Sequence, residues 1–487
     1  MMLAKETDLF KAEAQFQDLI DFVDDCVRHE ERIDRAERGL LDRLLKLGHT
    51  LLERFVAGHG SGDMGETLDV DDQKYKRLEA THHRRYVSIF GELKIDRVVY
   101  GTRETQKLQA VPLDAVLGLP ESDFSHVLQD WLQQFCVKDS YAESVGALAG
   151  LLNLKVSVGA AEDLNAQMAK HGEQYRFDQA PPPPEEEGEL FVVTADGKGV
   201  VMRKPDQPEQ PKAKSAATDG KKGTKRMAYV GAVYSVDRFI RTAEDVMDEL
   251  KRRQRAAKRP QPVGKRLWAE MTRLGEEEEL ITGRTVLFGQ MAEELTPRNL
   301  DMAKPVVCLM DGERALWLAK ETFFAESVVE ILDLFHASQR LWNAAHVFHE
   351  RGSTKAQQFV DARLLMLLEG KVGRVIGGLR QMLTKHALTS KRRKELQKVI
   401  TYFDNNRERM RYNEYLAQGY PIGSGVAEGA CRHLVKDRME GTGMRWRHEP
   451  AQAMLHLRAI YLNKDWDDFI EHRIQYEQQE LYGALAA

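Results

Sequence analysis

The sequence predicts an α/β core, a mixed sheet flanked by helices, which is interrupted by an all-helical insertion and preceded by a mainly helical region with a small β-hairpin. Short apolar runs rich in β-branched residues recur between 190 and 345, as is typical of buried strands. Residues 346–416 show only helical patterns, rich in Arg, Lys and Leu. Before residue 180 the apolar residues recur mostly at helical spacing, with one stretch of period two.

The chain has 487 residues, which corresponds to roughly two to four domains of ordinary size. Its 42% hydrophobic and 30% charged residues are typical of a globular protein. No apolar run has the length of a membrane span, and the first residues lack the apolar stretch of a secretory signal, so we expect a cytoplasmic protein.

The spacing of the cysteines and the distribution of charge indicate whether the chain can bind zinc or nucleic acid. The four cysteines are scattered singly, so no pair has the spacing of a zinc or redox motif, and we expect reduced, buried thiols: Cys26, Cys136, Cys308 and Cys431. The net charge of -5 alone argues against nucleic-acid binding. Bases nevertheless cluster at 203–226, 251–266 and 391–394, and such stretches can bind DNA.

The first 178 residues contain two segments. Residues 1–80 hold two long amphipathic helices that pair with each other or with another subunit. In the second segment, 81–178, a period-two pattern on either side of Gly91 and Glu92 predicts a β-hairpin with those residues in its loop.

Three helical stretches follow between 123 and 170, and Ser157 is a cap signal for the third. Their spacing is compatible with a helix-turn-helix that reads DNA. The third stretch, however, carries Glu162 and Asp163 and few bases, which is unfavourable in a major groove. A plain helical subdomain is therefore the alternative.

The proline and glutamate run of 179–189, QAPPPPEEEGE, predicts a stiff connector and the main domain boundary. The α/β core follows in two parts. The first is 190–345, the helical insertion is 346–416, and the second part, 417–487, contains a glutamate-bearing helix and C-terminal helices.

Three acidic residues are candidates for a common site. Asp196 ends the strand pattern LFVVTADG and Asp311 ends PVVCLMDG, each beside a glycine at which the chain is expected to turn away. Asp-Gly is also a common turn dipeptide, which is the alternative for both. Glu428 lies one turn into a predicted helix after the glycine-rich YPIGSG, on a helix expected to pack across the open end of the sheet. Its alternative role is to complement the helix dipole.

If the three acids meet, their charges repel unless cations lie between them. Carboxylate oxygens suit Mg²⁺ or Mn²⁺. Two such ions roughly 4 Å apart can activate a nucleophile on one side of a phosphodiester and stabilise the leaving oxygen on the other. The expected chemistry is therefore phosphoryl transfer on nucleic acid.

Five longer motifs carry a family resemblance: TADGKGVVM, CLMDGERALW, VEILDLFHASQRLWNAAH, YPIGSGVAEGACRHLVKDRMEGTGMRW and AMLHLRA. Together they resemble the transposases of the ISKra group of bacterial insertion sequences, which are distant kin of the ISLre-group and Mutator-like enzymes. The likeness covers most of the chain after the connector, together with the hairpin and VPLDAVLGLP region.

This resemblance implies a ribonuclease-H-like domain with a DDE site formed by Asp196, Asp311 and Glu428, which hold two Mg²⁺ or Mn²⁺ ions. It implies cleavage of double-stranded DNA at the terminal inverted repeats of an element and strand transfer into target DNA. It also implies a homodimer or higher oligomer in the bacterial cytoplasm, at the nucleoid.

Asp333 and His336 form a D-x-x-H pair that resembles the C/D-x-x-H motif of the Mutator-like relatives. In a functional role the histidine donates to a phosphate oxygen or moves a proton. The alternative is a structural pair that closes the last strand onto its helix.

Several bases and one tryptophan are expected to contact DNA. Arg432 and Lys436 follow Glu428 at one-turn intervals on one helix face, and salt bridging on a solvated helix is the alternative. Trp446 is expected to stack on an unpaired base, with a place in the core as the alternative. Further expected contacts are Lys198, Lys221, Lys222, Lys225, Arg226, Arg438 and Arg445. The basic loop 203–226 is alternatively a solvated hairpin loop.

Many relatives carry paired cysteines after the N-terminal hairpin, and this chain has none there, so we expect no zinc-dependent fold in that region. Three rival functions are kept open. These are a catalytically inactive DNA-binding protein derived from a transposase, a metal-dependent nuclease without strand transfer, and an unrelated two-acid hydrolase of glycosides.

Overall fold

The structure is a computed structural model that describes residues 2–70, 73–101, 110–203, 225–251, 258–275, 279–441 and 443–486. The chain forms two compact units. One comprises Met1–Arg176 together with Asp465–Ala487, and the other comprises Phe177–Lys464. The C-terminal residues from Asp465 onward, which the sequence analysis assigns to the core, therefore group with the N-terminal unit.

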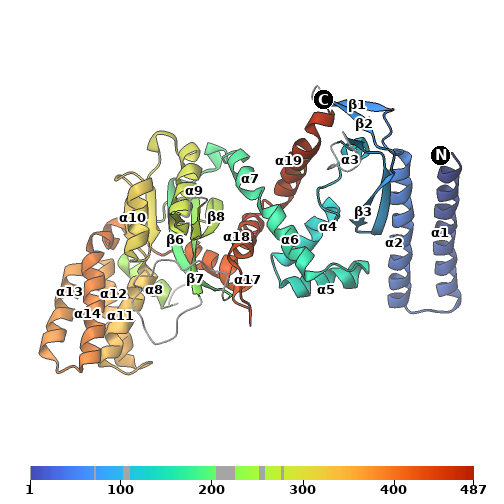
Figure 1. Cartoon of the computed structure of the whole chain (residues 1–487). Coiled ribbons are helices and arrows are strands. Elements are labelled where there is room, and N and C mark those ends of the chain that lie inside the picture. The colour runs from blue at the N-terminus through green and yellow to red at the C-terminus, as the bar shows by residue number, and fades with distance from the viewer. Residues whose placement is uncertain are drawn as a thin grey trace. The chain divides into compact units, whose positions relative to one another are not determined.

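The two long N-terminal helices are confirmed as α1 (Met2–Arg28) and α2 (Ile33–Gly58). They pack against each other along their length (Figure 1). Arg43 of α2 lies over the Phe22 ring of α1, 3.8 Å from its centroid, and Lys11 pairs with Glu53 at 3.2 Å.

The predicted β-hairpin is present, but its loop is two residues earlier than expected. Strands β3 (His82–Ser88) and β4 (Gly91–Arg97) pair antiparallel with Ser88 opposite Gly91, so Ile89 and Phe90 form the loop. Gly91 has a φ of +121°, a conformation that favours glycine, and it begins the second strand. The three-stranded sheet beside it was not predicted: β1 (Thr67–Val70), β2 (Gln73–Arg77) and β5 (Tyr100–Gly101).

The three predicted helical stretches of this unit are confirmed, and each begins at a serine whose hydroxyl accepts a bond from a first-turn backbone N–H: α4 (His126–Cys136) at Ser125, α5 (Tyr141–Leu152) at Ser140 and α6 (Val158–Ala169) at Ser157. The remaining helices are α3 (Pro112–Leu117), α7 (Gly172–Asp178), which runs across the unit boundary, and α19 (Trp466–Ala486). On α19, Arg473 donates to Gln129 and Glu477, which fixes this helix to α4.

The second unit is built on a five-stranded sheet with the order β12-β11-β6-β7-β8. Strands β6 (Leu190–Val201), β7 (Lys225–Val236) and β8 (Val263–Met271) are antiparallel neighbours. Strands β11 (Val306–Met310) and β12 (Val329–Leu332) run parallel to β6. The predicted mixed α/β sheet is therefore confirmed. A short pair, β9 (Arg273–Leu274) and β10 (Leu280–Ile281), lies outside this sheet.

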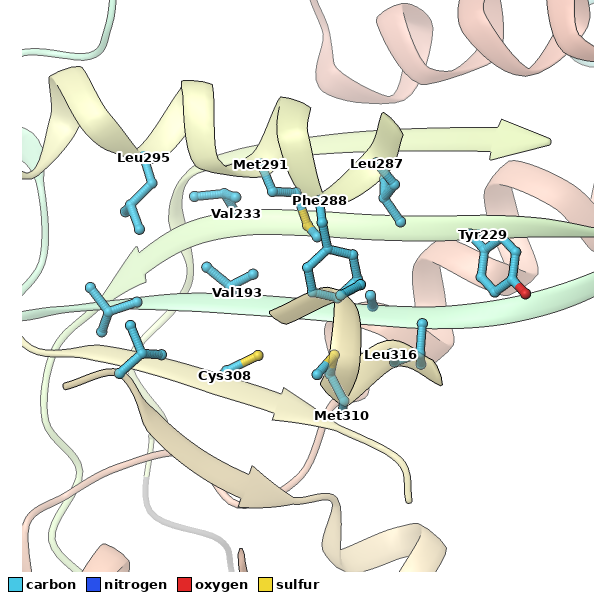
Figure 2. Close-up of a cluster of buried hydrophobic side chains, with 14 of the residues drawn as sticks. Val193, Tyr229, Val233, Leu287, Phe288, Met291, Leu295, Cys308, Met310 and Leu316 are labelled. Atoms are coloured by element: carbon cyan, nitrogen blue, oxygen red, sulfur yellow. The ribbon is translucent and has the colours of Figure 1, made fainter. Parts of the chain in front are cut away.

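The main hydrophobic core lies on one face of this sheet, under α9 (Gly283–Arg298) and α10 (Arg314–Phe323). Because side chains alternate along a strand, Val193 of β6 and Cys308 of β11 point to the same face. Figure 2 shows Phe288 and Met291 of α9 pointing into this cluster beside Val193. The other face of β6 carries Val192, Thr194 and Asp196.

The stretch 346–416 is all-helical apart from its turns, as predicted, but the helices begin earlier, at Leu334. Helices α11 (Leu334–Phe348), α12 (Thr354–Leu368), α13 (Val372–Lys385) and α14 (Ser390–Asn405) stand side by side as a bundle (Figure 1). The turn η3 (Arg407–Arg409) and α15 (Tyr412–Ala417) lead back to the sheet. Other helical segments of this unit are η1 (Pro184–Glu186), α8 (Ala243–Leu250) and η2 (Leu300–Met302).

After the insertion the chain forms α16 (Gly425–Ala430), the π-helical turn η4 (Cys431–Lys436), α17 (Asp437–Met439) and α18 (His448–Asn463). The helix α16 packs against β6 and β7, the middle of the sheet rather than one of its edges. None of the described helices combines the length and apolar content that a membrane span needs.

Candidate active site

The first two acids lie at the same level, Asp196 within β6 and Asp311 directly after the neighbouring strand β11. In the parallel pairing of β11 with β6, Cys308 is the partner of Val193, so three residues further along each strand Asp311 reaches the level of Asp196. The Thr194 hydroxyl donates to the Leu309 carbonyl oxygen at 2.7 Å, which ties the two strands one step before the acids. Adjacent strands are about 4.8 Å apart, so this register brings the two carboxylates close together.

The position of Asp196 within its strand differs from the prediction. Asp311 directly follows β11, as expected. The strand β6, however, continues through Gly197 to Val201, and the chain does not turn away at Gly197. A Cβ at 197 would lie 2.7 Å from the terminal methyl group of Met227 on the paired strand β7, an exposed and flexible side chain.

Both carboxylates face away from the main core. Val193 and Ala195 point into that core, so Asp196 points to the opposite face of β6. This is the face against which α16 packs, because the Cys431 thiol donates to Asp196 Oδ2 at 3.5 Å. Cys431 lies three residues after Glu428, so this contact brings the end of α16 onto Asp196.

Local hydrogen bonds fix the acids. Asp311 Oδ1 accepts from the Glu313 backbone N–H at 2.6 Å, and the Trp317 indole N–H donates to the Asp311 carbonyl oxygen at 2.7 Å. Asp196 Oδ1 accepts from its neighbour Gly197 N–H at 2.7 Å. The Glu428 backbone N–H donates to the Ser424 carbonyl oxygen at 3.0 Å, which closes the first turn of α16.

The three acids share one electrostatic environment. Burial raises the pKa of Asp311, and the Asp196 carboxylate raises it further. The pKa of Glu428 is also raised, first by partial burial and then by the carboxylates of Asp333 and Asp196. His336 opposes both shifts, so this histidine lies within electrostatic reach of Asp311 and Glu428.

A divalent cation fits the chemistry of this donor set. The carboxylate oxygens are hard ligands, and burial together with neighbouring carboxylates raises the pKa values of Asp311 and Glu428. In the described part of the chain, no three Asp, Glu, His or Cys side chains converge closely enough to surround an ion as they stand. An ion shared by all three acids therefore requires their side chains to draw together.

Asp333 and His336, the two residues of the D-x-x-H pair, have different roles. Asp333 is fully buried, and its Oδ1 accepts from the backbone N–H groups of Phe335 at 2.6 Å and His336 at 3.4 Å, which caps α11. Its Oδ2 accepts from both the backbone N–H and the hydroxyl of Ser424. His336 Nδ1 is 3.9 Å from Asp333 Oδ1, too far for a hydrogen bond. Asp333 therefore has the structural role, and His336 is the member that faces the acids.

The bases that were expected to bind DNA fall into three groups. Lys198 and Lys225 both lie near Glu440, at 3.6 and 3.7 Å. Residues whose side chains are open to solvent are Arg432, Lys436 and Arg445, while Arg226 is half-buried. The expected contacts Lys221 and Lys222 lie outside the described residues.

Two of the expected DNA contacts are core residues instead. Arg438 is 2% exposed and lies 5.0 Å from the centroid of the Trp446 ring. Trp446 is 7% exposed, its indole N–H donates to the Met439 carbonyl oxygen at 3.2 Å, and its backbone pairs with β6 through Val201. Both side chains are buried where the segment after α17 packs, so neither is exposed to a DNA strand.

The helix after Glu428 is not a regular α-helix. Residues Cys431–Lys436 are wound as a π-helical turn, in which residues five apart lie on the same face. Arg432 accordingly lies 3.8 Å from Asp437. Residues four apart also still meet here, since His433 Nδ1 lies 2.9 Å from Asp437 Oδ2.

Four further residues at the site were not predicted as part of it: Glu313, Arg340, Tyr402 and Cys431. Partial burial and the Asp311 carboxylate raise the pKa of Glu313, and Arg340 lowers the pKa of Asp311. Glu313 lies only two residues after Asp311, so its position in the sequence could have indicated that it belongs to the site. The other three lie on separate helices: Arg340, Tyr402 and Cys431. Only the fold brings them close to the acids.

Comparison with known proteins adds no family assignment, because no protein-family model matches the chain and no curated protein matches it either.

Proposed function

We propose that the chain is a DDE transposase that cleaves DNA at the ends of an insertion sequence and joins the freed ends to target DNA. One observation carries the proposal. The parallel register of β6 and β11 brings Asp196 and Asp311 to one level, on the face of the sheet that α16 covers with Glu428. Acids from three distant parts of the chain have no reason to be brought to one face of the sheet for stability alone, because their charges repel.

We also propose that the second unit is a ribonuclease-H-like domain. Its five strands, numbered along the chain within this sheet, have the spatial order 5-4-1-2-3, with the first three antiparallel and the last two parallel to the first. This is the arrangement expected of a ribonuclease-H-like sheet. The helical bundle enters between the fifth strand and the helix bearing Glu428, as the resemblance implies.

In this proposal Asp196, Asp311 and Glu428 hold two Mg²⁺ or Mn²⁺ ions. Such ions activate a water or a 3′-hydroxyl and stabilise the leaving oxygen of a phosphodiester. The chain's own residues supply the rest. Asp333 holds Ser424 and with it the start of α16, and His336, beside Asp311 and Glu428, is placed to donate to a phosphate oxygen.

Double-stranded DNA is the proposed partner, at the element ends and in the target. Handling two ends calls for at least two copies of the chain. The α1–α2 hairpin supports such assembly, since each helix leaves large apolar side chains exposed at intervals of three, four or seven residues: Phe16, Ile20, Val23 and Val27 on α1, and Leu41, Leu44, Leu51 and Phe55 on α2. Sedimentation of the full chain should accordingly give at least the mass of a dimer.

The test uses the purified full chain and a plasmid carrying the DNA that flanks its gene. With Mg²⁺ or Mn²⁺ we expect cleavage at the element ends and joined products. Asp196→Asn, Asp311→Asn and Glu428→Gln should each reduce both activities at least about 100-fold, because each removes a metal ligand. The control Glu326→Gln changes an exposed acid on a loop and should leave both unchanged.

The same assay separates the rival functions. Cleavage without joined products identifies a nuclease, and salt-sensitive binding without cleavage identifies an inactive DNA-binding protein. Hydrolysis of glycosides without activity on DNA identifies the two-acid hydrolase. Full cleavage and joining by all three acid variants would remove the basis of the proposal.

A further inference from the structure

A shallow, open groove of about 450 Å³ runs along one face of α14 in the helical bundle. Its lining residues recur at intervals of three and four, which places them on a single helix face: Lys394, Gln397, Lys398, Thr401, Tyr402 and Asn405. Each of them carries a hydrogen-bonding or charged group. Most of the exposed lining surface is nevertheless apolar, and Lys394 and Lys398 add positive charge to it.

The outer end of the groove is positively charged. Among the described residues Lys394 makes no ion pair. Lys398 pairs with Glu395 at 2.8 Å, but both side chains are largely exposed, so a phosphate can displace this weak pair. Lys391, one turn before Lys394, is also exposed.

The inner end of the groove lies at the candidate active site. The ring of Tyr402 packs directly against Gly312, the neighbour of Asp311, and leaves no space for a Cβ there. The Arg340 guanidinium lies 4.5 Å from the centroid of the same ring. Arg340 also lies within electrostatic reach of Asp311. The lysines of the groove and Arg340 therefore supply positive charge from the outer end of the groove to the acids.

The dimensions suit a DNA strand. Lys394 and Tyr402 are eight residues apart, about 12 Å along the helix axis. Lys394 and Lys398 are one turn apart, about 6 Å, so each can meet a different phosphate of one strand. Backbone contacts of this kind position DNA without reading its sequence.

We propose that this face of α14 binds the phosphate backbone of the DNA strand that enters the candidate active site. The inference rests on the proposed function and adds a surface outside the three acids and their neighbouring bases. Lys394 and Lys398 contact successive phosphates, and Arg340, beside the Tyr402 ring, contacts the phosphate nearest Asp311.

The test compares two double variants that lose the same charge from the same helix. Lys394→Gln with Lys398→Gln removes the groove cations. Arg392→Gln with Arg393→Gln removes two exposed cations that do not line the groove. Binding of a labelled duplex of arbitrary sequence is measured by fluorescence anisotropy without divalent metal, over a series of NaCl concentrations, and thermal unfolding verifies that both variants fold.

We expect the groove variant to lower the slope of log affinity against log salt by roughly 1.4 to 1.8, because each lost phosphate contact removes about 0.7 to 0.9. Its affinity should fall about tenfold, and in the cleavage assay KM should rise while kcat stays near its original value. The control pair should change the slope by less than about 0.5.

The outcomes separate this inference from the proposed function. If the unaltered protein binds and cleaves DNA while both pairs behave alike, the groove does not carry the strand and the inference is wrong, although the function stands. If the unaltered protein neither binds nor cleaves DNA, the function fails and the inference fails with it.

Discussion

Asp333 accepts hydrogen bonds from both the backbone N–H and the hydroxyl of Ser424, the residue that precedes α16. The same carboxylate caps α11. One fully buried acid therefore joins the helix of His336 to the helix of Glu428. In the D-x-x-H motif, the aspartate thus positions the site and does not itself face a substrate.

Replacing Asp333 should be costly. Asp333→Ala leaves several buried donors without a partner and should lower the free energy of unfolding by about 3 kcal/mol or more. Asp333→Asn keeps a hydrogen-bond acceptor and should lower the free energy of unfolding by less. Ser353→Ala, which removes only the cap of α12, is the control and should cost about 1 kcal/mol. Urea denaturation measures all three, and equal costs for Asp333→Ala and Ser353→Ala would show that the tie to Ser424 contributes nothing.

The acids should make the metal-free protein less stable as the pH rises. The folded pKa values of Asp311 and Glu428 lie above their unfolded values, so the native state keeps these protons to higher pH. Stability from them is present below the ordinary carboxyl pKa, about 4, and is lost as the pH rises through the raised values.

In EDTA, Asp311→Asn should therefore be more stable than the original protein by about 1 kcal/mol at pH 7. The difference should shrink toward pH 4, as measured by thermal unfolding across this range. A difference that is independent of pH would contradict the assignment of the raised pKa to Asp311.

Gly312 should tolerate no side chain. A Cβ there meets the Tyr402 ring and lies 2.8 Å from Asn406 Nδ2, so Gly312→Ala should cost about 1 to 3 kcal/mol. Combining it with Tyr402→Leu should recover part of this cost, because the ring is the closest obstacle. A double-mutant cycle by urea denaturation measures the coupling, and purely additive costs would mean that the two residues do not touch.

Trp446 should matter for stability and not for DNA binding. Trp446→Phe loses the hydrogen bond to the Met439 carbonyl oxygen and part of a buried ring, so unfolding should become easier by about 1 to 2 kcal/mol. Affinity for single-stranded DNA should stay unchanged in an anisotropy titration. A clear loss of that affinity in a stably folded variant would restore the stacking role.

The sequence predicted Asp311 better than Asp196, for a physical reason. The apolar run before Asp311 ends where β11 ends. In β6 the glycines after Asp196 look like a turn, yet Gly197 lies within the strand because the pairing of β6 with β7 needs extended backbone as far as Val201. A neighbouring strand creates that need, and local sequence does not reveal it.

Tertiary packing also determines which residues around the two aspartates belong to the site. A tryptophan between two arginines is compatible with both a DNA surface and a core, and only the pairing of Trp446 with β6 identifies it as core. The choice of Glu428 depended on family resemblance, since an acid in a first helical turn is common. Its approach to Asp196 comes from the packing of α16 on the sheet.

The most direct test of the central claim is calorimetric titration of the full chain with Mn²⁺ at pH 7.5, with and without bound DNA. We expect binding that any one of Asp196→Asn, Asp311→Asn and Glu428→Gln weakens at least about tenfold, because all three carboxylates hold the same ions. Mn²⁺ binding that is unchanged in all three variants, or absent from the original protein even with DNA, would contradict a shared metal site.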